Sequence, residues 1–155
     1  MRRGPRTKAR GAQLAKERPA AALASGPYEI EMTPSAKAVY VQLYQNMKKA
    51  EAKGEQSSSH HTILRKVEDA VKNIIPRDPI KRMHGLSGPL SNLFRLKKGR
   101  HRICWAASSA TRRVCILFIS ETLRKEGDAN DPYNVFTKLV LAGEFDEIIG
   151  RLREP

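Results

Sequence analysis

Acidic residues are missing from one long stretch of the sequence, residues 79–120, which contains nine Lys or Arg and no Asp or Glu. The whole chain has 29 Lys and Arg against 16 Asp and Glu, a net charge of +13. Residues 1–26 carry a net +6 and the acid-free stretch carries +9, so the rest of the chain nets −2. A localised positive field steers and holds a polyanion. The competing interpretation is a basic surface that serves only solubility.

Cysteine is scarce, and its two positions favour no disulfide framework. Cys104 and Cys115 both lie in apolar, strand-like segments, so we expect two reduced, buried thiols. No Cys-x-x-Cys pair occurs, and His60-His61 has no partner at ligand spacing. The sequence therefore predicts neither a metal site nor a metal cofactor.

Long hydrophobic runs are also absent. The longest one, Val114 to Ile119, is too short to cross a bilayer. No hydrophobic segment precedes Gly26, so we expect a cytoplasmic rather than a secreted protein.

The composition changes near residue 26. Residues 1–26 are rich in Arg, Ala, Gly and Pro and have no sustained apolar face. We interpret them as a basic, disordered N-terminal arm and residues 27–155 as one folded domain. The arm either adds nonspecific affinity for nucleic acid or has no role in binding.

The first part of the domain reads as a strand followed by a helical hairpin. Tyr28–Met32 alternates apolar and acidic residues, which predicts a half-buried strand. Thr33-Pro34 then supplies an N-cap and a proline for the first helical position, and the helix should end near Lys53-Gly54. A second helix is expected over His60–Ile75, where Pro76 stops it.

Three strands and further helices follow a basic loop, Pro79–Pro89. The expected strands are Asn92–Lys97, Arg100–Ala107 and Arg112–Ser120. The last strand is apolar on both faces, which is typical of a central strand. Asp131-Pro132 begins a third helix by the same capping logic, and a short terminal helix follows. The fold class is therefore α+β: a small antiparallel sheet packed on a helical hairpin, with a C-terminal helix and all helices on one face.

Several bases of the acid-free stretch alternate with large apolar residues, as in Leu93–Lys97 and Arg102–Trp105. Alternation places the core on one side of a strand and charge on the other. A sheet with a positive face is a platform for phosphates, so RNA or DNA is the expected partner.

These residues resemble a known family. The element order, the loop ending in Gly-Leu-Ser-Gly and the strand Gly-Arg-His-Arg-Ile-Cys-Trp are similar to the RelE superfamily of bacterial type II toxins, and most similar to its YhaV branch. The segments that carry the resemblance are Gly99–Arg102, Thr122–Arg124 and Asp131–Leu139. The last one matches the branch's pattern of Tyr, one residue, Val-Phe, one residue, Lys.

The resemblance implies a RelE-like fold and a metal-independent endoribonuclease that needs no cofactor. Such a toxin cuts mRNA, on the ribosome or free, and so inhibits translation. A cognate antitoxin, of the swapped-hairpin AbrB type in this branch, is implied as a partner. Two alternatives are a ParE-like gyrase poison, which normally lacks the Arg and Tyr set present here, and a non-catalytic RNA- or ribosome-binding protein.

The resemblance also implies site residues. Metal-free RNA cleavage needs proton transfer and positive charge at the phosphate, and a guanidinium is bidentate toward phosphate. The family's central catalytic arginine corresponds to Arg102 and its second one to Arg124, which would clamp the scissile phosphate. Tyr133 matches the C-terminal aromatic, which stacks on a base or helps proton transfer. Their structural alternatives are a sheet-face ion pair, a solvated loop charge and a core aromatic.

Further Lys and Arg residues of the acid-free stretch, residues 79–120, are expected to form a track that binds RNA phosphates. Its members are Arg82, Arg95, Lys97, Lys98 and Arg100. Leu93 takes a place where the family usually has a basic residue, so the residue that acts as general base stays unassigned. His101 has a suitable intrinsic pKa, but alternation points it away from Arg102. His84 lies in the basic loop, where contact with substrate is a candidate role.

Overall fold

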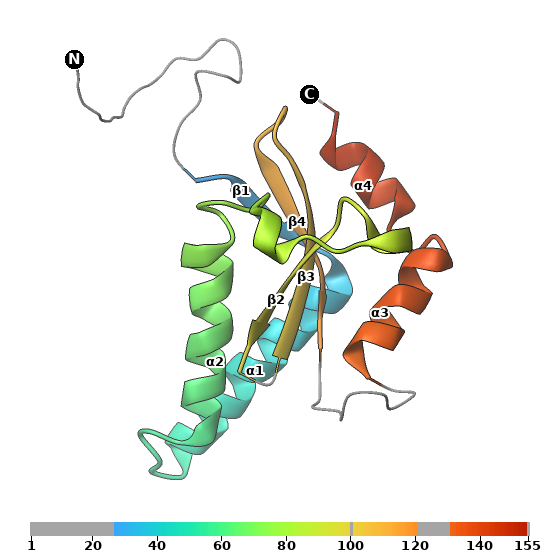
Figure 1. The fold of residues 1–155 in the computed structure, drawn as a ribbon. Helices are drawn as coiled ribbons and strands as arrows, with labels where there is room; N and C mark the ends of the chain where they lie inside the picture. The colour runs from blue at the N-terminus through green and yellow to red at the C-terminus, as the bar shows by residue number, and fades with distance from the viewer. Residues whose placement is uncertain (1–26, 100, 121–130, 155) are drawn as a thin grey trace, which may run out of the picture.

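The structure is a computed structural model that describes residues 27–99, 101–120 and 131–154. Within these ranges the chain forms one four-stranded sheet and four α-helices (Figure 1). The strands are β1 (Glu29–Met32), β2 (Phe94–Lys98), β3 (His101–Ser108) and β4 (Arg113–Ile119). The helices are α1 (Pro34–Ala52), α2 (Ser59–Asp69), α3 (Pro132–Leu141) and α4 (Asp146–Leu152). The α+β class predicted from the sequence is confirmed.

The sheet has the strand order β1-β4-β3-β2, so β1 and β2 are its edges. Strands β2, β3 and β4 form the expected antiparallel meander. The first strand joins it in parallel with β4, and Ile30 lies opposite Val114. The sheet is therefore mixed, whereas the sequence analysis predicted an antiparallel one. The helical hairpin and the loop after it carry the chain from one edge strand, β1, to the other, β2.

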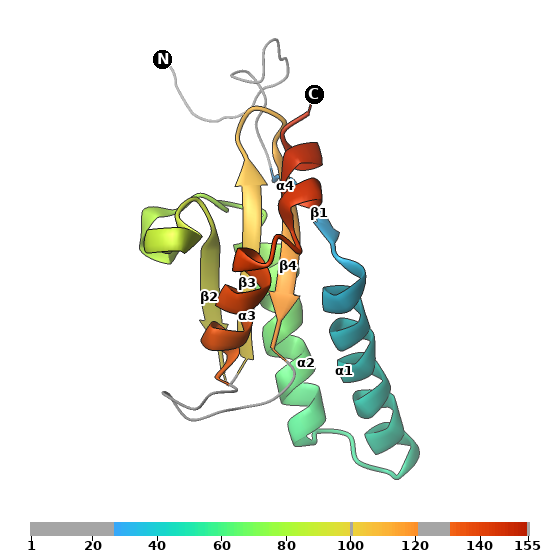
Figure 2. The ribbon, with the colours of Figure 1, turned by 90° about the vertical axis from the view of Figure 1, so that its right-hand side faces the viewer.

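Helices cover both faces of this sheet, and the prediction that they all lie on one face is wrong (Figure 2). The α1–α2 hairpin packs on Val114 and Ile116 of β4. On the opposite face, α3 and α4 pack on Cys115 and Leu117. A strand that is apolar on both faces needs helices packed on each face, because an uncovered face would expose apolar side chains to water.

Capping residues fix where two of the helices begin, as the sequence predicts. The Thr33 hydroxyl oxygen accepts a hydrogen bond from the Ala36 N–H at 3.1 Å. It also donates to the Leu117 carbonyl at 3.1 Å, which ties the start of α1 to the central strand. At α3 the Asp131 carboxylate accepts a bond from the Tyr133 N–H at 3.4 Å. Proline occupies the first turn of both helices, where its missing N–H costs nothing.

A register shift lies in the middle of the sheet. Cys104 pairs with Phe118, whereas Trp105 pairs with Ile116, so Leu117 is an extra residue in β4. This bulge turns both Leu117 and Phe118 toward α3.

The two cysteines are buried thiols, as expected. Burial raises the pKa of the Cys104 thiol to about 12 and that of Cys115 to about 11. In the described part of the chain, no helix is long and apolar enough to cross a membrane.

Candidate active site

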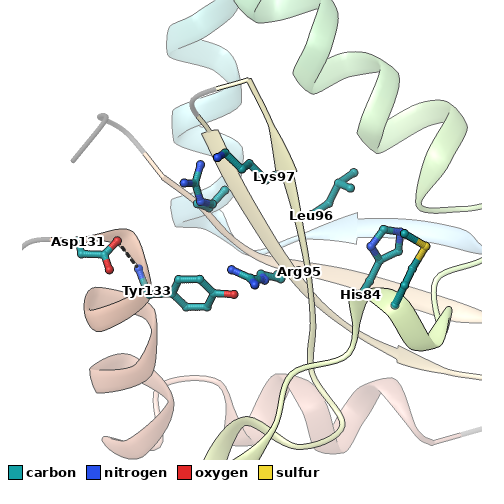
Figure 3. A pocket seen from close by; sticks show the side chains of 8 residues that line it. His84, Arg95, Leu96, Lys97, Asp131 and Tyr133 are labelled. Atoms are coloured by element: carbon teal, nitrogen blue, oxygen red, sulfur yellow. Dashed lines mark hydrogen bonds between the residues drawn. The ribbon is translucent and has the colours of Figure 1, made fainter. Parts of the chain in front are cut away.

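A cleft of about 460 Å³ opens beside the edge strand β2 (Figure 3). Three segments supply its walls: the loop before β2, the strands β2 and β3, and the start of α3. Its lining residues are Met83, His84, Arg95, Leu96, Lys97, Arg102, Asp131 and Tyr133.

The cleft's cations come together because of the strand pleat. Phe94 and Leu96 of β2 pack in the core that faces the α1–α2 hairpin. Successive side chains of a strand point to opposite faces, so Arg95 and Lys97 point to the α3 face. Lys97 pairs across the ladder with Arg102 of β3, which brings a guanidinium and an ammonium to one patch. Three of the predicted site cations thus line the cleft: Arg95, Lys97 and Arg102.

Tyr133 closes the cleft from the first turn of α3. The Arg95 guanidinium lies over its ring, 4.3 Å from the ring centroid (Figure 3). Burial raises the pKa of the Tyr133 phenol, and the charges of Arg95 and Arg102 oppose that shift only in part. The phenol is therefore protonated at neutral pH. It can donate a proton or a hydrogen bond, but it is not a base.

Lys98 stands apart from the other predicted RNA-binding residues. Its ammonium lies 3.4 Å from the Asp69 carboxylate of α2, on the hairpin side of the sheet. Arg82 is exposed in a 3₁₀ turn, Arg82–His84, and does not line the cleft. Arg100 and Arg124, like the N-terminal arm, lie outside the described residues.

The histidines differ in position. His101 is buried on the hairpin side with Ile103 and Trp105, as alternation predicts, and burial lowers its pKa. His84 lines the cleft and contacts the Trp105 ring edge-on, with the ring centroids 5.9 Å apart. Burial, followed by the charge of Lys81, lowers the pKa of His84.

Sequence reasoning missed Met83, which is 74% exposed at the cleft. Loop residues follow no period, so neither Met83 nor His84 gives a periodic signal. The one available signal was their place in a basic loop directly before an amphipathic strand.

Two other bases of the acid-free stretch serve the fold. The Arg113 guanidinium donates to the carbonyls of Arg151, Leu152 and Glu154 at 2.6, 3.1 and 3.2 Å, and so caps the C-terminus of α4. The Arg112 guanidinium lies over the Tyr28 ring, 4.4 Å from its centroid. Among the described residues, no group of three or more His, Cys, Asp or Glu is placed to hold a metal ion.

A small α+β domain with a cationic cleft at a sheet edge has the charge that suits phosphate-bearing ligands. The chain belongs to the YhaV toxin family, described as a toxin with endonuclease activity, of toxin-antitoxin system. The family model matches residues 31–154. The protein is thus a toxin of the endonuclease type whose system includes an antitoxin, and the resemblance seen in the sequence is confirmed.

The solved structures that are similar to the chain include two toxins. One is the RelBE2 toxin–antitoxin complex from Mycobacterium tuberculosis, with 18% identity, a TM-score of 0.45, and coverage of 63% of this chain and 94% of that chain. The other is the isolated RelE toxin of E. coli, with 12% identity, a TM-score of 0.45, and coverage of 74% and 97%. No curated protein matches the sequence.

Proposed function

We propose that the protein is a metal-independent endoribonuclease that cuts mRNA in the cytoplasm and so inhibits translation. The observation that supports this most is the convergence of Arg95, Lys97 and Arg102 on one cleft with the protonated phenol of Tyr133. Permanent cations stabilise the negative charge that develops on phosphate oxygens, and a protonated phenol can supply the proton that a leaving alkoxide needs.

The proposed reaction uses the RNA's own 2′-hydroxyl as nucleophile. Its oxygen attacks the adjacent phosphorus, the bond from phosphorus to the 5′-oxygen breaks, and the products are a 2′,3′-cyclic phosphate and a 5′-hydroxyl. Arg102 stabilises the phosphorane-like oxygens, and Tyr133 gives its proton to the departing 5′-oxygen. An unassigned base takes the proton of the 2′-hydroxyl. Arg124, by the family resemblance, completes the clamp on the scissile phosphate.

The neighbouring phosphates are proposed to follow the α3 face of the sheet edge. Arg95 and Lys97 lie on that face beside Arg102. Arg82, from the loop, would extend the track, and so would Arg100, which falls between β2 and β3 in the sequence. Lys98 contributes less than these, because its ion pair with Asp69 holds it on the other face.

The antitoxin is proposed to be of the swapped-hairpin AbrB type and to cover this cleft. An acidic segment of such a partner would meet the Arg95, Lys97 and Arg102 cluster. Residues 1–26, with their net charge of +6, are proposed to add affinity for RNA.

RNA cleavage by the purified full-length protein tests the proposal, with and without ribosomes and with and without EDTA. We expect cuts that leave 5′-hydroxyl and cyclic phosphate ends, at a rate that EDTA does not change. Arg102→Ala should slow cleavage about 100- to 1,000-fold, as loss of one charge-stabilising donor does elsewhere. The matched control Arg65→Ala, an exposed arginine of α2, should cleave at the wild-type rate. Binding of RNA with no cleavage under any of these conditions would contradict the proposal.

A further inference from the structure

We propose that the cleft has a second half, formed by Met83, His84 and Leu96, which binds a nucleobase of the RNA whose phosphate lies on Arg95, Lys97 and Arg102. This inference rests on the proposed function and specifies how that function recognises sequence. It concerns residues that the phosphate chemistry leaves without a role, although they line the same cleft.

The two halves of the cleft lie on opposite faces of β2. Arg95 and Lys97 belong to the α3 face, whereas Leu96 belongs to the hairpin face. In Figure 3 the Arg95 side chain lies between Tyr133 and His84, and Leu96 points away from Arg95. A nucleotide laid over this edge would place its phosphate among cations and its base against a thioether, an imidazole and an aliphatic side chain.

The loop that carries Met83 and His84 is held firmly against the sheet. The Trp105 indole N–H donates to the Pro79 carbonyl at 2.8 Å. The Leu86 N–H donates to the Leu93 carbonyl at 2.9 Å, and Gly85 forms an antiparallel bridge with Phe94. This subsite is therefore preorganised, which lowers the entropic cost of binding a ligand there.

Aromatic packing orients the His84 ring. Trp105 stacks on Phe94 with the ring centroids 6.1 Å apart, and His84 meets the same indole edge-on. Burial lowers the pKa of His84, so at neutral pH the ring is a neutral aromatic with one donor and one acceptor nitrogen. Such a ring can stack on a base or bond its edge, and the polarizable sulfur of Met83 suits an aromatic partner.

The backbone of β2 adds polar groups at the same place. The loop covers the outer edge of β2 as far as Phe94. The backbone N–H and C=O groups of every second residue in an antiparallel strand point to the same side. The Leu93 carbonyl points outward, where it accepts from the Leu86 N–H, so the N–H and C=O of Lys97, four residues later, also point outward. A donor and an acceptor beside an apolar wall are what discrimination between base edges requires.

Titration of the full-length protein with AMP, GMP, CMP and UMP, each compared with ribose 5-phosphate, tests the subsite. Methyl NMR of methionine-labelled protein follows Met83 directly. We expect at least one nucleotide to bind about 5- to 100-fold tighter than ribose 5-phosphate, as base stacking on an aromatic provides, and to shift the Met83 methyl signal.

Variants separate the two halves. Met83→Ala, at an exposed side chain, and His84→Ala should each remove most of the nucleotide's advantage, whereas His84→Phe should retain part of it. Ile80→Ala, an exposed residue of the same loop outside the cleft, should change nothing. Arg102→Ala should weaken ribose 5-phosphate and nucleotides alike.

Two outcomes of the titration would overturn the subsite: equal affinity for ribose 5-phosphate and all four nucleotides, or an advantage that Met83→Ala leaves intact. Mapping of RNA cut sites distinguishes this failure from failure of the proposed function. Wild-type cleavage whose base preference Met83→Ala and His84→Ala leave unchanged would refute the subsite alone. Nucleotide binding at Met83 by a protein that cuts no RNA would support the subsite and refute the ribonuclease.

Discussion

The guanidinium of Arg95 lies 4.3 Å from the centroid of the Tyr133 ring, so a permanent cation from the edge strand rests on the aromatic side chain that begins α3. This contact joins two elements that are far apart in sequence, and both residues line the cleft. The contact is made to the ring, which phenylalanine also has, whereas the phenolic hydroxyl is the group that phenylalanine lacks.

Tyr133→Phe should therefore distinguish the role of the ring in RNA binding from the role of the phenolic proton in cleavage. The ring remains for Arg95 to cover, so RNA affinity should stay within about twofold. Cleavage should fall about 100-fold or more, because the leaving 5′-oxygen loses its proton donor. Single-turnover cleavage together with filter binding measures both quantities. Full activity of Tyr133→Phe would remove the phenol from the mechanism.

Salt dependence should distinguish the two adjacent lysines of β2. Lys97→Ala should lower the slope of log affinity against log salt concentration by about 0.7, the value for one phosphate contact to single-stranded RNA. Lys98→Ala should lower the slope by less than Lys97→Ala does, since Lys98 pairs with Asp69 on the other face. Equal effects of the two substitutions would show that RNA phosphates contact both faces of the strand, and would contradict a phosphate track confined to the α3 face.

Arg113 should matter for stability rather than for RNA. Its substitution by alanine removes three hydrogen bonds from the end of α4, so the free energy of unfolding should fall by about 1–3 kcal/mol. Chemical denaturation measures this loss, with Arg153→Ala, an exposed arginine at the same end of α4, as the control. RNA affinity per folded molecule should be unchanged by Arg113→Ala.

Acidification should destabilise the fold through His101. Burial lowers its pKa in the folded protein below the ordinary 6.5, so the unfolded chain binds the proton more tightly. The histidine's contribution is fully present above pH 6.5, and it is lost as the pH falls from 6.5 toward the folded-state pKa. The slope is at most about 1.4 kcal/mol per pH unit for one group. Denaturation curves of wild type and His101→Leu at pH 7.5 and 5.5 should show a smaller loss in the variant.

Local signals predicted most of the elements. Thr33-Pro34 and Asp131-Pro132 place the starts of α1 and α3 correctly because a cap acts within one helical turn. Alternation likewise predicted that Arg95 and Lys97 share a face, since the period of a strand is fixed by its geometry.

Non-local relationships were beyond the sequence patterns. An apolar stripe shows that a helix is buried but not against which face, so the side on which α3 packs was missed. The partner of Lys98 is Asp69, which lies on another element and leaves no trace in the spacing of β2. The parallel pairing of β1 with β4 depends on the path of the whole hairpin.

The chain has a single tryptophan, and it is buried between Phe94 and the loop that carries His84. Its indole is therefore an intrinsic fluorophore at the junction of loop and sheet, and a protonated imidazole in contact with it would quench its emission. The unlabelled wild-type toxin accordingly contains an optical probe beside its cleft, and a ligand that contacts His84 should change the emission of Trp105.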